Sequence, residues 1–308
     1  MSNLCDVIGL RMSYGKADAQ YETEFDAATG TIWGYFNPRG TACFSPGLLR
    51  DIRLHDSALA VNGGRVELDG DLLPAKFYVC GSRLPGVFNL GGDLSLFLML
   101  IRSKDREALA KYARTCIDNM FARIQNYYAP NLITISMVQG DALGGGLECA
   151  LSSDVVIAEE GAQMGLPEIL FNMFPGMGAY SLLARRVGAR AAEKIILSGR
   201  MMSAAELHEA GVVDVLAKNG EGEAATQDWI ARNSRRHNGT QAVFRARQLV
   251  HPISRQELDS IADLWVDAAF RLGDKDLRMM ARLVRSQMRR MEGEERVDIA
   301  AQPLAAAI

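Results

Sequence analysis

Cysteine is scarce in this chain of 308 residues, and its spacing excludes two kinds of stabilised domain. The five cysteines are Cys5, Cys43, Cys80, Cys116 and Cys149, and no two of them form a C-x-x-C pair. Disulfide frameworks and structural zinc sites are recognised by such regular spacing. We therefore expect buried, reduced thiols, no metal site and no bound redox cofactor.

An excess of charge of one sign and long apolar runs are also lacking. The formal net charge is −3, which gives no global electrostatic reason to expect nucleic acid or a membrane surface as a partner. No stretch reaches the roughly 18 uninterrupted apolar residues that span a bilayer, and the N-terminus lacks a basic region followed by an apolar core. We expect a cytoplasmic protein without membrane insertion.

Several common catalytic signatures are absent. The sequence contains no Gly-x-Ser-x-Gly elbow, no Gly-x-x-x-x-Gly-Lys-Ser/Thr loop and no His-Glu-x-x-His zinc motif. The segment 176–178 lacks the third glycine of a dinucleotide fingerprint. We assign no role to the four histidines, which stand apart from the motifs described below: His55, His208, His237 and His251.

The patterns that are present predict an α/β layered core. Residues 21–25 and 31–36 flank a turn-like segment and predict a hairpin, and Ser45-Pro46 begins a helical pattern. Apolar positions at three-four spacing predict a long helix between residues 103 and 128. Buried strands are predicted at 76–80, 132–138 and 154–158.

Strand signals nearly vanish after about residue 203, where helical patterns begin near Ser203, Ala224, Thr240 and Ser254. We therefore divide the chain into an α/β catalytic core (1–202), a helical C-terminal subdomain (203–299) and a flexible tail (300–308). The tail has little to anchor it.

Two glutamates frame the most informative part of the sequence. Glu148 follows a run of three glycines that opens a helix, and Glu168 lies 20 residues later between a proline and an apolar segment. An ionised carboxylate is expensive to bury in such apolar surroundings unless it is paired or functional. Each glutamate taken alone could belong to a structural ion pair, but two of them beside glycine-rich turns indicate a catalytic pair.

From about residue 76 to 216 the sequence resembles the crotonase (enoyl-CoA hydratase/isomerase) superfamily. The resemblance depends on the order of its motifs: strand 76–80, Gly91-Gly92-Asp93, a long helix, 144–148, 167–169, 175–178 and 197–204. It implies a spiral of ββα units with a helical C-terminal trimerisation region. A trimer or a dimer of trimers is the homo-oligomer that the family implies.

Two segments depart from ordinary hydratases. The first oxyanion turn of those enzymes usually has a small Ser/Ala-Gly-Ala-Asp pattern, whereas this chain has 89–93, Asn-Leu-Gly-Gly-Asp. The segment 34–46 is also unlike theirs. Together these departures resemble the diffusible-signal-factor synthases, bacterial crotonases that make cis-2-unsaturated fatty-acid signals.

The chemistry of a thioester explains why such residues would be needed. Removing the weakly acidic α-proton requires donors that meet the developing enolate oxygen, each worth about 3–4 kcal/mol when properly aimed. The backbone N–H groups of Gly92 and Gly145 are our candidates for this oxyanion hole, because glycine allows close approach and Gly145 begins a helix. By analogy with the hydratases, Glu168 faces C2 and Glu148 faces the C3 oxygen of a 3-hydroxyacyl thioester.

A long acyl chain needs an apolar pocket. Candidate wall residues come from two apolar segments, although side chains of these types more often belong to the core: Leu94, Phe97, Leu98, Leu170, Met173 and Phe174.

The synthase resemblance makes acyl carrier protein the expected partner and a two-component sensor protein a further candidate. The substrate would be carried on phosphopantetheine, which carrier protein and coenzyme A share, so the motifs do not choose between them. Arg102, Lys104 and Arg106 are candidates for docking an acidic carrier. A second basic stripe, more typical of a solvated or intersubunit face, contains Arg278, Arg282, Arg285 and Arg289.

Three functions therefore stay open at this point. The leading hypothesis is a diffusible signal factor synthase, a lyase that dehydrates a 3-hydroxyacyl carrier protein and also hydrolyses the cis-2-enoyl thioester to the free acid. The second is a conventional hydratase or isomerase acting on CoA esters. The third is a non-catalytic crotonase-like protein that binds acyl thioesters or regulates a signalling protein.

Overall fold

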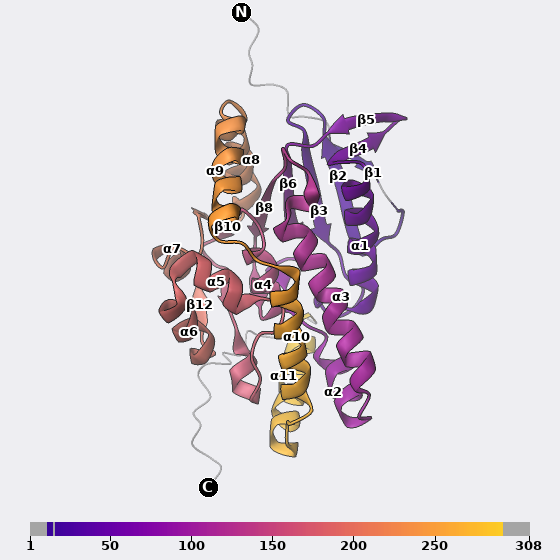
Figure 1. Cartoon of the computed structure of the whole chain (residues 1–308), viewed down its shortest axis with the longest axis vertical. Coiled ribbons are helices and arrows are strands. Elements are labelled where there is room, and N and C mark those ends of the chain that lie inside the picture. Colours follow the sequence, from indigo (N-terminus) through magenta and orange to yellow (C-terminus); the bar gives the residue numbers. More distant parts are fainter. Residues whose placement is uncertain (1–10, 15, 292–308) are drawn as a thin grey trace, which may run out of the picture.

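The computed structural model describes residues 11–14 and 16–291 (Figure 1). Two β-sheets lie at its centre, with helices packed around them. Cys5, the expected tail at 300–308 and the side chain of Arg289 lie outside the described residues. Within the described part, no helix is both long enough and apolar enough to cross a membrane.

The larger sheet has seven strands in the order β1-β2-β3-β6-β8-β10-β13. The first two pairings are antiparallel and the remaining four are parallel. Its strands are β1 (Arg11–Tyr14), β2 (Tyr21–Asp26), β3 (Thr31–Phe36), β6 (Phe77–Ser82), β8 (Ile133–Val138), β10 (Val155–Glu159) and β13 (Val215–Ala217).

A second sheet has four strands in the order β12-β11-β9-β7, and a separate hairpin joins β4 to β5. The bounds of these strands are β7 (Val87–Asn89), β9 (Asp141–Leu143), β11 (Gln163–Gly165), β12 (Met201–Ser203), β4 (Arg65–Leu68) and β5 (Asp71–Pro74).

The helices follow the sequence pattern closely. The helix predicted between residues 103 and 128 is α3, and the Ser-Pro start is confirmed at α1, where Ser45 Oγ accepts a hydrogen bond from Leu48 N at 3.2 Å. The helices are α1 (Pro46–Val61), α2 (Leu94–Arg102), α3 (Arg106–Ile124), α4 (Gly145–Leu151), α5 (Ala179–Val187), α6 (Ala189–Ser198), α7 (Ala204–Glu209), α8 (Gly222–Ser234), α9 (His237–Val250), α10 (Arg255–Ala269) and α11 (Asp274–Met291), with 3₁₀ turns η1 (Asn126–Tyr128) and η2 (Pro167–Phe171).

The predicted hairpin is confirmed as β2 and β3. Asp26 closes its turn, because Asp26 Oδ1 accepts a hydrogen bond from Ala28 N at 2.9 Å, and Gly30 takes a positive φ of 68°. The hairpin brings β3 beside β6, where the parallel part of the sheet begins.

The two sheets are linked by a repeated ββα pattern, which confirms the expected crotonase-like spiral of ββα units. Strands β6, β8 and β10 of the large sheet lead into β7, β9 and β11 of the small one, and a helix follows each pair. The corners pack closely: a Cβ atom on Gly140 would lie 2.0 Å from the backbone carbon of Gly86. Glycine is therefore required at position 140, where the connection between β8 and β9 crosses the connection between β6 and β7.

Side chains alternate between the two faces of the large sheet, as strand geometry dictates. Phe77 and Val79 of β6 belong to a smaller core cluster that includes Trp229 of α8. Tyr78 and Cys80, between them in sequence, face the larger cluster that contains α1 and α3. Both faces are therefore covered, which explains the near-continuous apolar runs of these strands.

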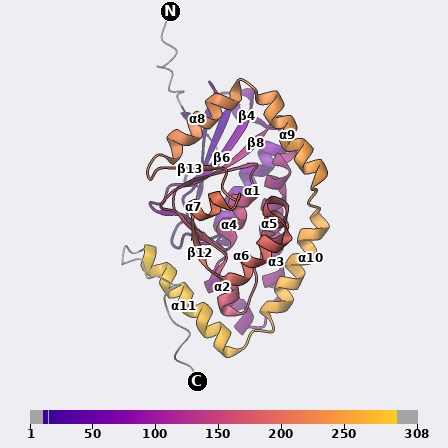
Figure 2. The ribbon, with the colours of Figure 1, turned by 90° about the vertical axis from the view of Figure 1, so that its left-hand side faces the viewer.

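The C-terminal helices α8, α9, α10 and α11 follow one another around the rim of the molecule (Figure 2). This part is largely helical, but β13 lies beyond the expected boundary at residue 203 and pairs with β10 of the large sheet. Strand pairing therefore continues past that boundary, and the uninterrupted run of helices begins with α8.

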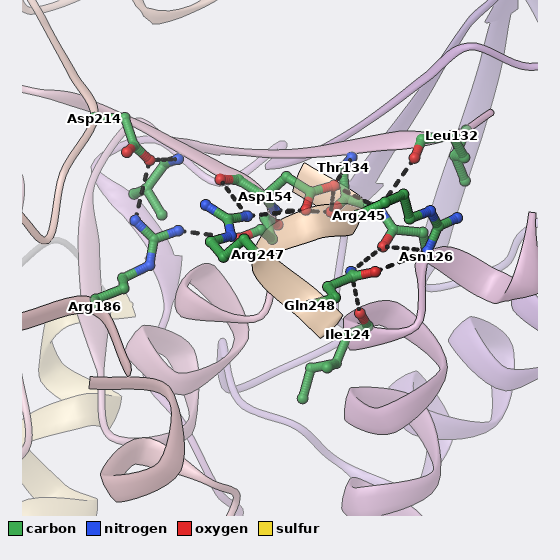
Figure 3. A network of polar contacts seen from close by, with 12 residues as sticks. Ile124, Asn126, Leu132, Thr134, Asp154, Arg186, Asp214, Arg245, Arg247 and Gln248 are labelled. Atoms are coloured by element: carbon green, nitrogen blue, oxygen red, sulfur yellow. Dashed lines mark hydrogen bonds and ion pairs between the residues drawn. The ribbon is translucent and has the colours of Figure 1, made fainter. Parts of the chain in front are cut away.

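Polar contacts, rather than buried apolar side chains, attach α9 to the core (Figure 3). The carboxylate of Asp154, only 4% exposed, accepts hydrogen bonds from Thr134 N at 3.0 Å and from Arg247 of α9 at 3.0 Å. Arg245 donates to the carbonyl oxygen of Ala129 at 2.6 Å, and Gln248 donates to that of Ile124 at 3.0 Å. These two donors thus bind backbone carbonyl groups at the end of α3 and just after η1.

Candidate active site

One cavity collects the two glutamates, both glycine turns and the C-terminal helices. Its volume is about 90 Å³, measured as the space that the centre of a water molecule can reach. Its walls come from α2, α3, α4 and η2, from the turns around residues 91 and 144, and from α10 and α11. Its lining residues include Leu90, Gly92, Leu94, Phe97, Tyr112, Cys116, Gly144, Gly145, Glu148, Glu168, Leu170, Met177, Trp265, Leu283 and Gln287.

The two glycine turns lie directly against each other. A Cβ atom on Gly91, where φ is +93°, would be 2.6 Å from the carbonyl oxygen of Leu143 and 3.0 Å from Gly145 N. A Cβ atom on Gly145 would be 3.5 Å from Gly92 N. Only glycine allows two backbones to approach this closely, so the amide groups of Gly92 and Gly145 reach the same end of the cavity.

These two amide groups are available to a ligand. No acceptor among the described residues takes the N–H of Gly92 or of Gly145. Gly145 is the first residue of α4, whose early N–H groups have no partner within the helix. Two unpaired donors at one end of an apolar cavity are suited to holding an oxygen atom that gains negative charge.

Glu148 lies in α4 and is only 1% exposed. Its Oε1 atom accepts hydrogen bonds from Met177 N at 2.7 Å and Ala179 N at 2.9 Å. Burial raises the pKa of this carboxyl to about 7, although the two backbone donors favour the ionised form and oppose the shift. Among the residues that the structure describes, no cation forms a salt bridge with this carboxyl group, so no ion pair fixes its charge.

Glu168 lies in η2 and is partly buried, with its Oε2 atom shielded from solvent and without a hydrogen-bond partner among the described residues. Its Oε1 atom lies against Gly144, the residue before α4, because a Cβ atom on Gly144 would be only 2.4 Å from it. Burial raises the pKa of this carboxyl to about 8, and the negative charge of Glu148 adds to the shift. The unpaired oxygen faces the interior rather than a structural cation.

The two carboxyl groups therefore titrate as a pair near neutral pH. Repulsion between their charges favours the state in which one is ionised and the other keeps its proton. One group that accepts a proton beside another that donates one is the arrangement required for acid–base chemistry on neighbouring atoms.

Three of the six expected acyl-pocket residues line the cavity: Leu94, Phe97 and Leu170. The other three do not. Leu98 and Met173 are buried in the main core, and Phe174 packs against that core. On α2, Leu98 follows Phe97 by one residue and so points about 100° away from it around the helix. Their contact with an acyl chain stays a prediction, since apolar character alone does not distinguish pocket from core.

The cavity also contains residues that the sequence did not indicate. Tyr112 and Cys116 lie on the apolar face of α3, a pattern that signals packing and not a pocket. Trp265 of α10 and Leu283 and Gln287 of α11 form its C-terminal wall. No local signal could have identified these three. They lie far from the motifs in sequence, and the local pattern of a helix does not say which part of the protein it packs against.

The expected docking residues lie at the junction of α2 and α3, and none of them lines the cavity. Arg102, Lys104 and Arg106 are all exposed. Arg106, however, forms an ion pair with Asp267 of α10 and lies 5.8 Å from the ring centre of Phe270. Of the second basic stripe, Arg278, Arg282 and Arg285 are exposed on α11.

Within the described residues, no three His, Cys, Asp or Glu side chains are grouped to hold a metal ion. Cys43, Cys80, Cys116 and Cys149 are buried and free, as the sequence predicted for them.

Comparison with known proteins places this site in context. The probable enoyl-CoA hydratase 2, mitochondrial, of Arabidopsis thaliana is 33% identical over 148 residues, which cover 48% of this chain and 46% of that protein. The 2,3-dehydroadipyl-CoA hydratase of Escherichia coli (strain K12) is 41% identical over 120 residues, or 39% of this chain and 45% of the enzyme. The matches thus span less than half the length of these curated relatives.

Solved structures show the same fold over nearly the whole chain. A putative enoyl-CoA hydratase from Streptomyces avermitilis superposes with a TM-score of 0.71 at 19% identity, covering 92% of this chain and all of that one, 100%. DspI of Pseudomonas aeruginosa superposes with a TM-score of 0.58 at 23% identity, covering 88% of this chain and 97% of that one.

The sequence profile of the enoyl-CoA hydratase/isomerase family matches residues 78–260, which include both glutamates and both glycine turns. More than half of the chain thus carries the features of one family, including the glycine turns that bring the two amide groups together. The chain therefore belongs to the enoyl-CoA hydratase/isomerase family.

Proposed function

We propose that this site adds and removes water across C2 and C3 of an acyl thioester. The observation that carries the proposal is the convergence of two carboxyl groups of raised pKa and two unpaired backbone N–H groups on one apolar cavity. The thioester oxygen binds the N–H groups of Gly92 and Gly145, which stabilise the enolate that forms when C2 loses its proton.

In the dehydration direction, Glu168 takes the C2 proton and Glu148 protonates the C3 hydroxyl. The C3–O bond then breaks, water leaves and the C2–C3 double bond forms. Hydration is the reverse of these steps. In either direction one carboxyl group must be ionised and the other protonated, which is the state that mutual repulsion favours.

We further propose that the chain is a diffusible signal factor synthase, which hydrolyses the enoyl thioester to a free cis-2-enoic acid. In this step water attacks the carbonyl carbon, the same two N–H groups bind the oxyanion, and the thiol leaves with a proton. Support comes from the two segments that depart from ordinary hydratases, because the structure joins them. Phe44 N donates to the carbonyl oxygen of Gly91 at 2.8 Å, and Leu90 N donates to that of Ala42 at 2.7 Å.

A tyrosine ties these segments together further. Tyr112 Oη donates to the carbonyl oxygen of Phe44 at 2.7 Å and accepts from Asp93 N at 3.3 Å. The unusual segment 34–46 thus supports the unusual turn 89–93, and both bear on the placement of Gly92 N. The position of that amide decides where the thioester carbonyl is held, so these contacts are where a difference in reaction at this carbon would arise.

A conventional hydratase acting on CoA esters is the second candidate, because curated relatives that match this chain in sequence carry hydratase names. A non-catalytic binding protein fits less well, since it would need neither two buried carboxyl groups nor a pair of unpaired donors.

Product analysis by mass spectrometry distinguishes these functions. The protein is incubated separately with 3-hydroxydodecanoyl carrier protein and with the matching CoA ester. Free cis-2-dodecenoic acid, formed preferentially from the carrier protein, supports the synthase. Reversible loss of water from the CoA ester without release of acid identifies a hydratase, and no turnover of either substrate refutes both enzymatic proposals.

Acyl carrier protein, a two-component sensor and further copies of this chain remain proposed partners. Arg102 and Lys104, which are exposed between α2 and α3, are the docking residues that we retain for an acidic carrier. The outer side of α9 exposes Val243, Leu249 and Val250, which supports self-association. Light scattering coupled to size-exclusion chromatography tests the assembly, and a monomer at all concentrations would contradict it.

A further inference from the structure

A second, smaller cavity lies behind the active-site cavity, between α1 and α3. The two cavities share two wall residues, Cys116 and Met177. Apolar side chains line much of the second cavity, including Ile52 of α1 and Met120 of α3. Its wall also carries polar groups, which a cavity built only for packing would not need.

Asn119 is the polar residue that sets this cavity apart. It is only 8% exposed, and its Nδ2 atom donates to the carbonyl oxygen of Leu49 at 3.2 Å. Its Oδ1 atom receives no hydrogen bond from any of the described residues, although it is shielded from solvent. A buried carbonyl oxygen of this kind normally accepts a hydrogen bond from an ordered water when the protein offers no donor.

Other polar groups on the same wall have protein partners. Tyr21 Oη is 2.8 Å from Tyr78 Oη, and Arg123 donates to Ser153 Oγ at 2.7 Å and to Tyr127 Oη at 3.1 Å. Among the residues that line the cavity, Asn119 is thus the one with a buried side-chain oxygen or nitrogen atom left unpaired.

The cavity has the right size for water and is too small for a substrate. Its volume, measured in the same way as that of the first cavity, is about 30 Å³. Because one water needs roughly 10–15 Å³ of such space, about two molecules fit. Asn119 follows Cys116 by three residues on α3 and so lies on the same helix face, which leads from the second cavity to the first.

We propose that the second cavity is an internal water site, held by Asn119, that exchanges water with the active site past Cys116 and Met177. This inference rests on the proposed hydration and dehydration. Trp265, Leu283 and Gln287 close one wall of the active-site cavity. The proposed acyl thioester would occupy the remaining space. The water formed from the C3 hydroxyl and the Glu148 proton therefore moves inward to the second cavity, and the water consumed in hydration comes from it.

A high-resolution crystal structure tests the water site without reference to activity. We expect ordered water within hydrogen-bond distance of Asn119 Oδ1. A cavity without such density, or one filled by a rearranged side chain, would overturn the proposal.

Isotope exchange tests the path. A 3-hydroxyacyl thioester labelled with oxygen-18 at C3 is turned over in unlabelled water, and mass spectrometry follows loss of the label from the remaining substrate relative to dehydration. In the native protein, two cavity waters dilute each released water to about one third before it adds back. Filling the cavity removes this dilution, so the fraction of re-formed substrate that keeps its label should rise about threefold, and the ratio of label loss to turnover should fall accordingly.

Two variants fill the cavity from opposite walls, Asn119→Leu from α3 and Ile52→Phe from α1, so that one remains informative if the other does not fold. Asn233→Leu is the matched control, because Asn233 is also buried and also donates from Nδ2 to a helix carbonyl, that of Trp229, but it does not line the cavity. An unchanged exchange ratio in folded cavity variants would refute the path. Absence of any dehydration would refute the proposed function instead, and the crystallographic result would then decide the water site.

Discussion

Replacing Gly91 by alanine should separate the two glycine turns and disable the oxyanion hole. The new Cβ atom would lie 2.6 Å from the carbonyl oxygen of Leu143 and 3.0 Å from Gly145 N. Both are backbone atoms, so no side-chain rotation relieves the contact. The turns must move apart by roughly 1 Å before the carbon–oxygen contact reaches its usual separation.

The expected loss of activity follows from that displacement. A misplacement of about 1 Å costs on the order of 100-fold in rate, and the loss of one donor of an oxyanion hole costs about 100- to 1,000-fold in kcat. We therefore expect kcat for hydration of a 2-enoyl thioester to fall about 100-fold or more in Gly91→Ala. KM should change less, because the donors act most strongly on the charge that develops in the transition state.

A second glycine separates this effect from backbone strain. Gly70, in the turn between β4 and β5, has φ of +88°, close to the +93° of Gly91, but a Cβ atom there would meet nothing within 4 Å. Alanine at either position carries the same conformational penalty of about 1–2 kcal/mol. Initial rates of hydration, measured by loss of the enoyl absorbance, should stay within about twofold of the native value in Gly70→Ala. Native rates in a folded Gly91→Ala protein, or an equal loss in both variants, would refute the reasoning.

Four further outcomes are expected. Glu148→Gln and Glu168→Gln should each lower the hydration rate by about 100-fold or more, as measured by initial rates, whereas native rates in both would contradict the assignment of the pair. The pH–rate profile should be bell-shaped with limbs near about 7 and about 8, since activity rises as the pair loses its first proton and falls as it loses the second. The folded state binds the Glu168 proton more tightly than the unfolded state does, so its stabilising contribution is full below the ordinary pKa of the group and is lost as pH rises through about 8. Between pH 5 and 9, denaturant titration should therefore show the free energy of unfolding of Glu168→Gln rising by about 2–4 kcal/mol relative to that of the native protein. A pH-independent difference would contradict the shift in pKa. Arg247→Met should lower the free energy of unfolding by about 1–2 kcal/mol because it leaves the buried Asp154 without its cation, and Arg232→Met on the exposed side of α8 is the control.

The sequence identified the parts of the site that depend on local rules. A glycine cluster after a buried strand predicted the start of α4, and the conflict between a charged Glu148 and its apolar neighbours predicted an unusual carboxyl group. Both inferences use only residues adjacent in the chain, so no tertiary information was needed. The hairpin of β2 and β3 followed in the same way from its turn residues.

The residues that the sequence missed depend on long-range packing. Trp265 and Gln287 reach the cavity because α10 and α11 follow the rim back to α2 and η2, a path that helical periodicity does not encode. Strand β13 has only three residues, too few for a clear alternating pattern, so its place in the large sheet was not foreseen. Leu98 was assigned to the pocket because hydrophobicity identifies burial without saying against what.

The wall that α11 adds to the cavity has a consequence for biosynthesis. The glutamates and the glycine turns are all made before residue 180, but Leu283 and Gln287 emerge from the ribosome about a hundred residues later. Gln287 then donates to the carbonyl oxygen of Leu90 at 3.1 Å, joining the last helix to the first donor turn. A nascent chain can therefore hold both carboxyl groups and both glycine turns while its cavity is still open on one side, and the cavity is complete only after α11 has been made.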